Sequence, residues 1–363
     1  MSEKINIKTV LIAPLDWGMG HATRCIPIIN ALLFYEYKVL IAATPQQKIL
    51  LQKEFIKVEF IDIEGYNVHY SNSKYLFAIK LLMQTPRVLS VIKNERLWLE
   101  KIIDEHKVDL VISDNRYGLH SKRVPCVFIT HQLNVKAPFD LIENLLRKIS
   151  YSFINKFTAC WIPDAAGNKN ASGILSHPKQ LPLIPVHYIG LLSRFEKIIS
   201  AEIKYDYCIV LSGPEPQRTI LENKILKDLH QVRGKILLVR GLLSTKEIIP
   251  STENVEIKNH LPGMQLQQAF QQSEYIISRS GYTTVMEILS LQKKSILIAT
   301  PGQTEQEYLS KILLKQNLCF CISQNNFNII TAIQQAKKFS YSTISLPVFK
   351  KETLQQLLSQ IQF

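Results

Sequence analysis

His21 is the residue of this sequence best suited to acid–base chemistry. It ends a glycine-rich run that includes Gly18 and Gly20, where a short apolar segment gives way to a helical pattern. Histidine titrates near neutral pH, and a glycine-rich turn lets a ligand approach the N–H groups at a helix start. We therefore expect His21 to be a general base, with Asp16 and Asp114 as alternative bases. A purely structural role for a histidine in such a loop is the competing interpretation.

A second polar run, at residues 278–287, follows an apolar segment at 275–277. A helix is expected to begin near Gly281, and such a turn offers hydroxyls and N–H groups to a diphosphate. Glu287 lies two turns into this helix, where its carboxylate could accept hydrogen bonds from ribose hydroxyls. The same side chains could instead only cap and solubilise the helix. The candidate ligand-binding residues of the run are Arg279, Ser280, Gly281, Thr283, Thr284 and Glu287.

Two further polar loops occur in the same half of the chain. They follow the apolar segments at 207–211 and 296–299. Amides and carboxylates in such loops can bind the hydroxyls of a sugar. The candidate residues are Ser212, Gly213, Arg218, Gln303, Gln306 and Glu307. Three polar strand ends in one half of the chain favour a site for a polar ligand.

Three common types of site find little support. A nicotinamide fingerprint needs a third glycine and an acidic residue after the second strand, where this chain has Ala42, Ala43 and Thr44. The G-x-x-x-x-G-K-[ST] loop of phosphate-binding enzymes does not occur. The six cysteines lie in apolar stretches without C-x-x-C pairs, so we expect them to be buried and reduced rather than to bind a metal.

The elements that position these residues follow from the hydrophobic pattern. Short β-branched runs alternate with amphipathic stretches, which is typical of parallel sheets covered by helices. The pattern pauses between residues 164 and 195, where Gly, Pro, Ser and His dominate. We predict an α/β protein with two doubly wound domains. The predicted divisions are a first domain at 1–165, a linker at 166–200, a second domain at 201–349 and an amphipathic helix at 350–363.

Composition sets the broad class of the protein. The chain has 363 residues, enough for two hydrophobic cores. No apolar run approaches the about 18 residues of a spanning helix, and no signal peptide is evident, so we expect a cytoplasmic protein. The formal net charge of +13 attracts polyanions of any kind. Charge alone does not choose among nucleic acid, acidic lipid and phosphorylated substrates.

Several of these motifs together resemble those of a known family. The run at 279–287, followed by 301–303 and 306–308, is similar to the donor-binding half of MurG-like glycosyltransferases, which belong to glycosyltransferase family 28 and have the GT-B fold. Gly18 to His21, the run at 131–134 and the pair Gly190 and Arg194 support the resemblance. These motifs cover almost the whole chain, in the family's order.

The resemblance implies a fold and a reaction. It implies two Rossmann-like domains facing a central cleft, with the acceptor in the first domain, the uridine nucleotide in the second, and the helix at 350–363 packed back on the first. The implied enzyme moves a hexosyl group, with N-acetylglucosamine as the first guess, from a UDP-sugar to a membrane-associated or lipid-linked acceptor. It works by an inverting reaction without metal or cofactor, and nucleic acid is not an expected partner.

The resemblance also implies roles for individual residues. Glu287 would hold the ribose, Thr284 and the Gly281 turn the diphosphate, and Arg194 the donor near the linker. Gln306 and Glu307 would hold the sugar hydroxyls, and His21 would stand beside the acceptor hydroxyl. The residues expected on the acceptor side are Gly18, Gly20, Asn115, His131 and Asn134.

The sequence departs from the family at two places. The family's glycine-rich loop is replaced at 212–216 by a segment with Pro214 and Pro216, which removes two N–H donors. Arg218 is expected to supply the lost positive potential. The family's glutamine pair is Gln306 and Glu307 here, so the identity of the sugar stays open. An epimerase or hydrolase of the same fold, and a non-catalytic sugar-nucleotide-binding subunit, are the alternative functions.

Two segments of the first domain suggest contact with an anionic membrane. At 76–99 and 141–157, apolar residues at helical spacing are interspersed with Lys and Arg. Apolar faces rimmed by cations suit an interfacial helix. A helix that covers a parallel sheet has one apolar face for a different reason, so this interpretation competes with simple packing. The basic residues chosen for a test are Lys80, Arg87, Arg147 and Lys148.

Overall fold

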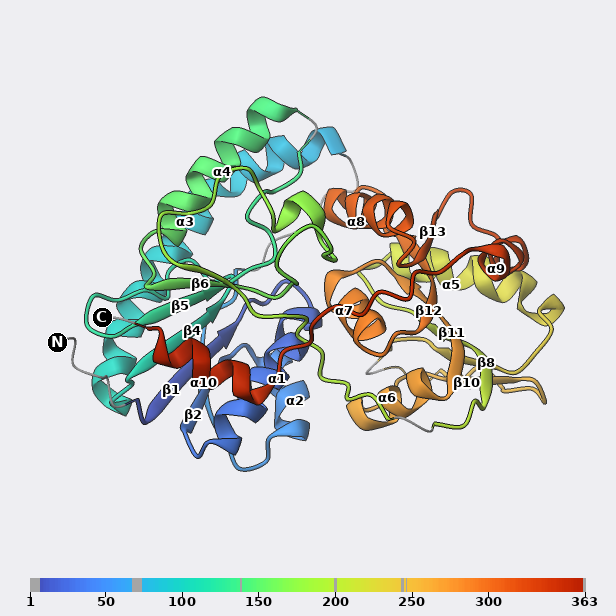
Figure 1. Ribbon diagram of the computed structural model, residues 1–363, viewed down its shortest axis with the longest axis horizontal. Coiled ribbons are helices and arrows are strands. Elements are labelled where there is room, and N and C mark those ends of the chain that lie inside the picture. Colours follow the sequence, from blue (N-terminus) through green and yellow to red (C-terminus); the bar gives the residue numbers. More distant parts are fainter. Residues whose placement is uncertain are drawn as a thin grey trace. The chain divides into compact units, whose positions relative to one another are not determined.

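The computed structural model shows an α/β protein with two parallel sheets (Figure 1). It describes residues 7–66, 74–137, 139–198, 201–242, 245 and 247–361, with only the backbone described at 74–87. The chain divides into two compact units. The first contains residues 1–194 together with 347–363, and the second contains 195–346.

The first unit is built on a seven-stranded sheet. Its strands are all parallel and lie in the order β3-β2-β1-β4-β5-β6-β7. The central strands are buried on both faces, which explains their continuous apolar sequences. The strands are β1 (Thr9–Pro14), β2 (Lys38–Ala43), β3 (Glu59–Asp62), β4 (Leu110–Asp114), β5 (Cys126–Ile129), β6 (Ala159–Ile162) and β7 (Val186–Tyr188).

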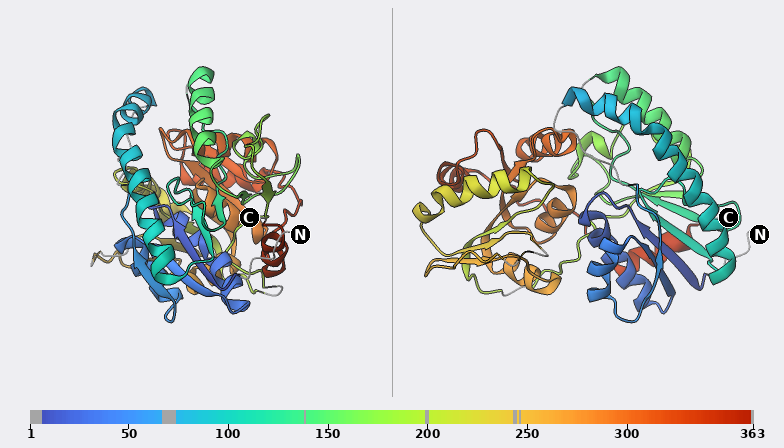
Figure 2. Two further views of the ribbon diagram at one scale, coloured as in Figure 1. Left: turned by 90° about the vertical axis from the view of Figure 1, so that its left-hand side faces the viewer. Right: turned by 180° about the vertical axis from the view of Figure 1, so that it is seen from behind.

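Helices connect the strands of this unit, and one returns from the end of the chain. The described helices are α1 (Met19–Phe34), α2 (Pro45–Glu54), α3 (Lys74–His106), α4 (Asp140–Ile154), the short η1 (Gly173–Leu175) and α10 (Lys351–Ser359). The terminal α10 lies beside α1, with Leu354 and Leu357 buried. The left view of Figure 2 shows α3 and α4 as two separate helices that both extend beyond the sheet.

The second unit repeats this plan with six parallel strands in the order β10-β9-β8-β11-β12-β13. Its strands are β8 (Tyr205–Val210), β9 (Ile236–Val239), β10 (Val255–Lys258), β11 (Ser273–Arg279), β12 (Lys294–Ala299) and β13 (Phe320–Ser323). Its helices are α5 (Gln217–Asp228), η2 (Leu229–Gln231), α6 (Gly263–Gln271), α7 (Tyr282–Ser290), α8 (Thr304–Lys315) and α9 (Ile329–Lys338).

Strand order locates the place where each sheet can bind a ligand. In the first unit the order reverses between β1 and β4, and in the second between β8 and β11. The loops that leave these two strands turn to opposite sides, which opens a crevice at their carboxyl ends. The loops after β1 and β4 carry Asp16 and Asn115, and those after β8 and β11 carry Gly213 and Gly281.

The predicted α/β class with parallel sheets is confirmed, but the linker predicted at 166–200 is wrong over most of its length. Residues 166–194 belong to the first unit, and β7 adds the last strand to its sheet. The polar composition has a structural cause. The buried carboxylate of Asp164 accepts hydrogen bonds from the backbone N–H groups of Ala171 and Ser172, so a Gly/Ser-rich run folds tightly around it.

The structure also bears on the predictions for the cysteines and for membrane-spanning helices. All six cysteines are buried and free, as predicted. None of the described helices has the length and apolar character needed to cross a membrane.

Candidate active site

The first part of the site is the loop between β1 and α1. Gly18 has φ +86°, a backbone conformation that side chains rarely adopt, and α1 begins one residue later. This places His21 in the first turn of α1, with 14% of its side chain exposed. The Nδ1 atom of His21 lies 2.9 Å from Oδ2 of Asp114, at the carboxyl end of the neighbouring β4. Two of the three predicted bases therefore contact each other.

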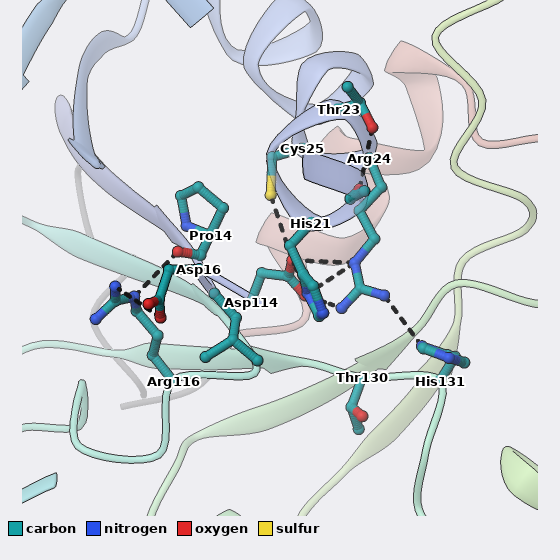
Figure 3. Close-up of polar contacts among 12 residues, drawn as sticks. Pro14, Asp16, His21, Thr23, Arg24, Cys25, Asp114, Arg116, Thr130 and His131 are labelled. Atoms are coloured by element: carbon teal, nitrogen blue, oxygen red, sulfur yellow. Dashed lines mark hydrogen bonds and ion pairs between the residues drawn. The ribbon is translucent and has the colours of Figure 1, made fainter. Parts of the chain in front are cut away.

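A buried arginine completes this contact. Arg24, one turn after His21, donates from Nε to both carboxylate oxygens of Asp114 at 3.0 Å, and its Nη2 pairs with the same carboxylate. Its Nη1 lies 3.0 Å from Nδ1 of His131, which follows β5. Figure 3 shows Arg24 between the two partners, with His21 and Asp114 on one side and His131 on the other.

Burial and charge shift the pKa values of this cluster in opposite directions. Burial of Asp114 favours its neutral form, but the charge of Arg24 and the contact with His21 outweigh it and bring the pKa of Asp114 to about 2. The pKa of His21 is lowered from the ordinary value of 6.5, first by burial and then by the charge of Arg24, although Asp114 acts in the opposite direction. At neutral pH the pair is thus an uncharged histidine beside a carboxylate.

Asp16 has a different environment. Its Oδ1 accepts a hydrogen bond from the backbone of Tyr66 at 3.1 Å and lies 3.7 Å from Nη2 of Arg116, which is fully buried. Arg116 is also bound to Glu95 of α3, at 2.6 Å. Gly65 packs so closely that an added Cβ would stand 2.5 Å from Asp16 Oδ2. Asp16 therefore joins the loop after β3 to the site.

The residues expected to bind the acceptor lie on these same loops. Gly20 is in the first turn of α1, and Asn115 directly follows β4 with the left-handed φ of +57°. His131 and Asn134 follow β5 and are buried. The Nδ2 atom of Asn134 lies 3.5 Å from Glu143, which also binds Lys136. The structure brings His131 to the cluster of His21, Arg24 and Asp114, whereas Asn134 contacts the start of α4.

In the second unit, the loops after β11 and β12 come together. Gly281 precedes α7, and a Cβ added there would lie 4.0 Å from Nε2 of Gln306. Gln306 spans its own loop, because its Oε1 accepts from the backbone of Thr300 at 2.9 Å and its Nε2 donates to Gln303. Glu307 accepts from the backbone of Gly302 at 3.1 Å. These polar side chains therefore line the N-terminal ends of α7 and α8.

The remaining residues of the 279–287 run differ in exposure. Thr283 and Thr284 are half-exposed in the first turn of α7, and Glu287 is only 4% exposed. Ser280 is buried and donates to the backbone of Gln306, so it joins β11 to α8. Arg279 is also buried and donates to the backbone of Gln217 and Ala299, while burial lowers its pKa to about 10.

The segment after β8 contains Ser212, Gly213 and Arg218, and the surroundings of Arg218 differ from those expected from the sequence. Ser212 and Gly213 are exposed there, and Gly213 has φ +101°. Arg218 is buried and paired with two carboxylates, with Nε 2.5 Å from Glu215 and Nη1 3.0 Å from Glu222. Since both partners belong to the protein, Arg218 is a poor source of positive potential for a ligand. Its expected role as replacement for the lost N–H donors stays a prediction, which these contacts disfavour.

Two further residues mark the limits of the sequence prediction. Arg194, expected near the donor, is the last residue of the first unit before the chain enters the second, and its side chain is half-buried. Arg24 was not singled out from the sequence. Its spacing from His21 is three residues, which places both on one face of a helix, and this periodicity is the signal that could have revealed it.

The described residues offer no cluster of metal-binding side chains. No group of three or more His, Cys, Asp or Glu side chains in that part of the chain is placed to hold a metal ion. Metal-independent chemistry remains a prediction.

Known proteins similar to this chain are glycosyltransferases. Residues 216–346 match the model of the glycosyltransferase family 28 C-terminal domain. The second half of the chain therefore resembles the C-terminal domain of family 28, and the whole chain is similar to MurG-like glycosyltransferases. It is 24% identical over 296 residues to a UDP-N-acetylglucosamine–N-acetylmuramyl-(pentapeptide) pyrophosphoryl-undecaprenol N-acetylglucosamine transferase of Clostridium tetani, covering 77% of this chain and 74% of that protein.

Solved structures agree with the family on the fold. MurG of Acinetobacter baumannii superimposes with a TM-score of 0.53 at 13% identity, covering 97% of this chain and 94% of that one. The spinosyn rhamnosyltransferase SpnG, solved with thymidine diphosphate, gives a TM-score of 0.61 at 14% identity, with 97% and 100% covered. The match at 216–346 includes the loops at Gly281 and Gln306, so both loops belong to the part of the chain that resembles the family domain.

Proposed function

We propose that this glycosyltransferase moves a hexosyl group, with N-acetylglucosamine as the first candidate, from UDP to a hydroxyl of a lipid-linked acceptor. The observation that carries the proposal is the contact between His21 and Asp114 at the switch point of the first sheet. A carboxylate can only accept hydrogen bonds, so Nδ1 of His21 carries the proton toward Asp114 and Nε2 is left to accept one. His21 is the base, and Asp114 orients it.

The chemistry requires one proton transfer and one displacement. Nε2 of His21 removes the proton of the acceptor hydroxyl while that oxygen bonds to the sugar C1, and the bond between C1 and the diphosphate oxygen breaks with its electrons on the diphosphate. A single displacement of this kind inverts C1. Asp114, with a pKa of about 2 and no exposure, is a poor proton acceptor and serves to hold the imidazole.

The second unit supplies the donor half of the proposal. The N-terminal end of α7, with Gly281 and Thr284, would receive the diphosphate, because N–H groups and the positive end of the helix dipole favour negative charge there. Glu287 would hold the ribose hydroxyls, and Gln306 with Glu307 the sugar. UDP is proposed because the relative from Clostridium tetani is named for a UDP donor.

A membrane-associated acceptor is supported by the surface of α4. Leu141, Leu145 and Ile149 form one stripe on this helix and are 83%, 54% and 47% exposed. Lys148 is exposed beside them, and Arg147 is half-exposed. We therefore propose a cytoplasmic enzyme that docks on an anionic membrane through α4. The side chains at 76–87, including Lys80 and Arg87, lie outside the residues that the structure describes.

The proposal is tested with a panel of nucleotide sugars. UDP-sugars should raise the melting temperature without added metal, whereas dTDP- and GDP-sugars should have little effect. Transfer is then measured with a lipid-diphosphate-linked acceptor, with and without EDTA. Release of free sugar or epimerised nucleotide in the absence of acceptor would favour the hydrolase or epimerase. Binding of UDP with no turnover, unaffected by changes at His21 or Asp114, would favour a non-catalytic subunit.

A further inference from the structure

The contacts of Arg24 go beyond what a His–Asp pair requires. Asp114 receives three contacts from Arg24, one from His21 and a longer one of 3.8 Å from Sγ of Cys25. All of these groups except His21 are buried almost completely. Because Arg24 binds through Nε and Nη2, its remaining Nη1 is directed away from the carboxylate and toward His131.

These contacts determine which nitrogen of each histidine carries the proton. The carboxylate of Asp114 has only acceptors, so Nδ1 of His21 must donate to it. The guanidinium of Arg24 has only donors, so Nδ1 of His131 must accept from it. Nε2 of His131 lies at the longer distance of 3.5 Å from the amide nitrogen of Gln132, which is also a donor. A neutral imidazole accepts at one nitrogen only, and the charged donor Arg24 at 3.0 Å makes the stronger contact, so His131 carries its proton on Nε2. The two histidines, which follow β1 and β5, are held in opposite tautomers by the two ends of one ion pair.

The ion pair also controls the charge of His21. A histidine beside an uncompensated buried carboxylate tends to become protonated, because the opposite charge favours the imidazolium. Here Arg24 cancels the charge of Asp114 at direct contact distance. The other titratable groups of the cluster are His131, after β5, and Cys25, on α1. Neither can replace the cation that Arg24 provides.

We propose that Arg24 is a positioning residue that makes one histidine a base and the other a donor. By neutralising Asp114 it leaves His21 uncharged with an unprotonated Nε2, and by binding His131 it turns that side chain into an Nε2–H donor toward oxygen atoms of the substrate. The proposal depends on the proposed function only where it calls His21 a base. The tautomers and the charge state are properties of the protein without substrate.

The first test uses nitrogen chemical shifts of ¹⁵N-histidine-labelled protein, with resonances assigned from the variants His21→Gln and His131→Gln. At neutral pH, His21 should show its proton on Nδ1 and His131 should show its proton on Nε2. This measurement on the unmodified protein needs no activity. The same tautomer at both sites, or a charged His21 at pH 7, overturns the proposal.

The second test removes the cation. In Arg24→Gln the pKa of His21 should rise by about one pH unit or more, the scale of one close charge, and the acid limb of kcat/KM for transfer should move by the same amount. Arg123→Gln is the matched control, because Arg123 pairs with Asp104 at the exposed surface. An unshifted titration in folded Arg24→Gln would mean that Arg24 is only structural.

A third variant covers the case in which Arg24→Gln does not fold. Arg24→Lys keeps the charge but lacks the fork that reaches His131, so His21 should stay neutral at pH 7 while His131 becomes a mixture of tautomers. An unchanged His131 in this variant contradicts the proposal. The two proposals can fail separately. If the histidines show the expected tautomers but the protein transfers no sugar, the proposed function is refuted and the role of Arg24 is not.

Discussion

At the scale of single residues, the site consists of side chains whose environment decides their chemistry. His21 and Asp114 make one hydrogen-bonded pair, yet only His21 is exposed enough to meet a substrate. Asp16, the third candidate base, is tied to Tyr66 and Arg116. Residue type alone placed His21 first, with Asp16 and Asp114 as alternatives. The contacts separate the two aspartates, because Asp114 pairs with His21 whereas Asp16 is held by Tyr66 and Arg116.

The role of His21 leads to the first prediction. His21→Gln should lower turnover by about a hundredfold or more, the usual contribution of general base catalysis, without changing donor affinity. Because the base must be unprotonated, kcat/KM of the unmodified enzyme should fall as pH drops through the pKa of His21, which lies below 6.5. His230→Gln, at an exposed histidine, is the control. Near-normal turnover of His21→Gln would transfer the role of base to another group.

The role of Glu287 leads to the second prediction. Glu287→Ala should weaken UDP binding by about 1 to 3 kcal/mol, the scale of hydrogen bonds lost from a charged group. Isothermal calorimetry measures the affinity, and circular dichroism checks that the variant is folded, since Glu287 is buried. Glu274→Ala is the matched control at an exposed position of β11. Equal UDP affinity of Glu287→Ala and the unmodified protein would refute the ribose assignment.

At the scale of elements, the two parallel sheets explain why distant motifs meet. Each functional loop leaves the carboxyl end of a strand, and parallel strands place these ends along one edge of the sheet. The register pairs Pro14 of β1 with Asp114 of β4, so the loop after β1 starts beside Asp114. The helix that follows this loop then carries His21 and Arg24 to the same carboxylate.

The exposed stripe on α4 leads to a prediction for that element. Co-sedimentation with vesicles should increase with the fraction of anionic lipid and decrease with salt, because basic residues contribute about 1 kcal/mol each near a charged surface. Binding should fall for the charge reversals Arg147→Glu and Lys148→Glu and for Leu145→Asp, but not for Lys311→Glu on α8. The reversals Lys80→Glu and Arg87→Glu extend the same test to α3. Equal recovery with neutral and acidic vesicles would contradict docking.

At the scale of the whole molecule, the chain leaves its first unit and returns to it. Residues 195–346 form the second unit, and the segment from 347 onward belongs to the first again. The backbone N–H of Leu191 donates to the carbonyl of Pro347 at 2.9 Å, which joins the two ends of this long excursion. The last helix, α10, then packs on α1, the helix that carries His21.

This return leads to a prediction about stability. Leu354 of α10 is fully buried, so Leu354→Ala should reduce the free energy of unfolding by about 2 to 5 kcal/mol through lost contacts and a residual cavity. Urea unfolding followed by circular dichroism measures the change, and Gln356→Ala on the exposed side of the same helix is the control. A loss no larger than that of the control would show that α10 does not support the first unit.

The sequence by itself determined much of the fold and the location of the polar loops. Strands such as β8 and β12 were visible because apolar β-branched runs are a local property, and the terminal helix was visible in the spacing of Leu354, Leu357 and Leu358. The family resemblance depended on a contiguous run at 279–287. Strand β7 escaped because its three residues lie within the polar run at 164–195, where they carry too little pattern to separate them from a loop.

Only the tertiary structure decided how the site works. His21 and Asp114 are 93 residues apart, and Arg24 and His131 are 107 apart, so no local pattern joins them. Arg218, judged from its type and position, was expected to face a ligand, but the fold places Glu222 one helical turn away and neutralises it. The physical reason is that a side chain's charge and hydrogen-bonding capacity depend on burial and on its partners, and these are set by long-range packing of the sheet.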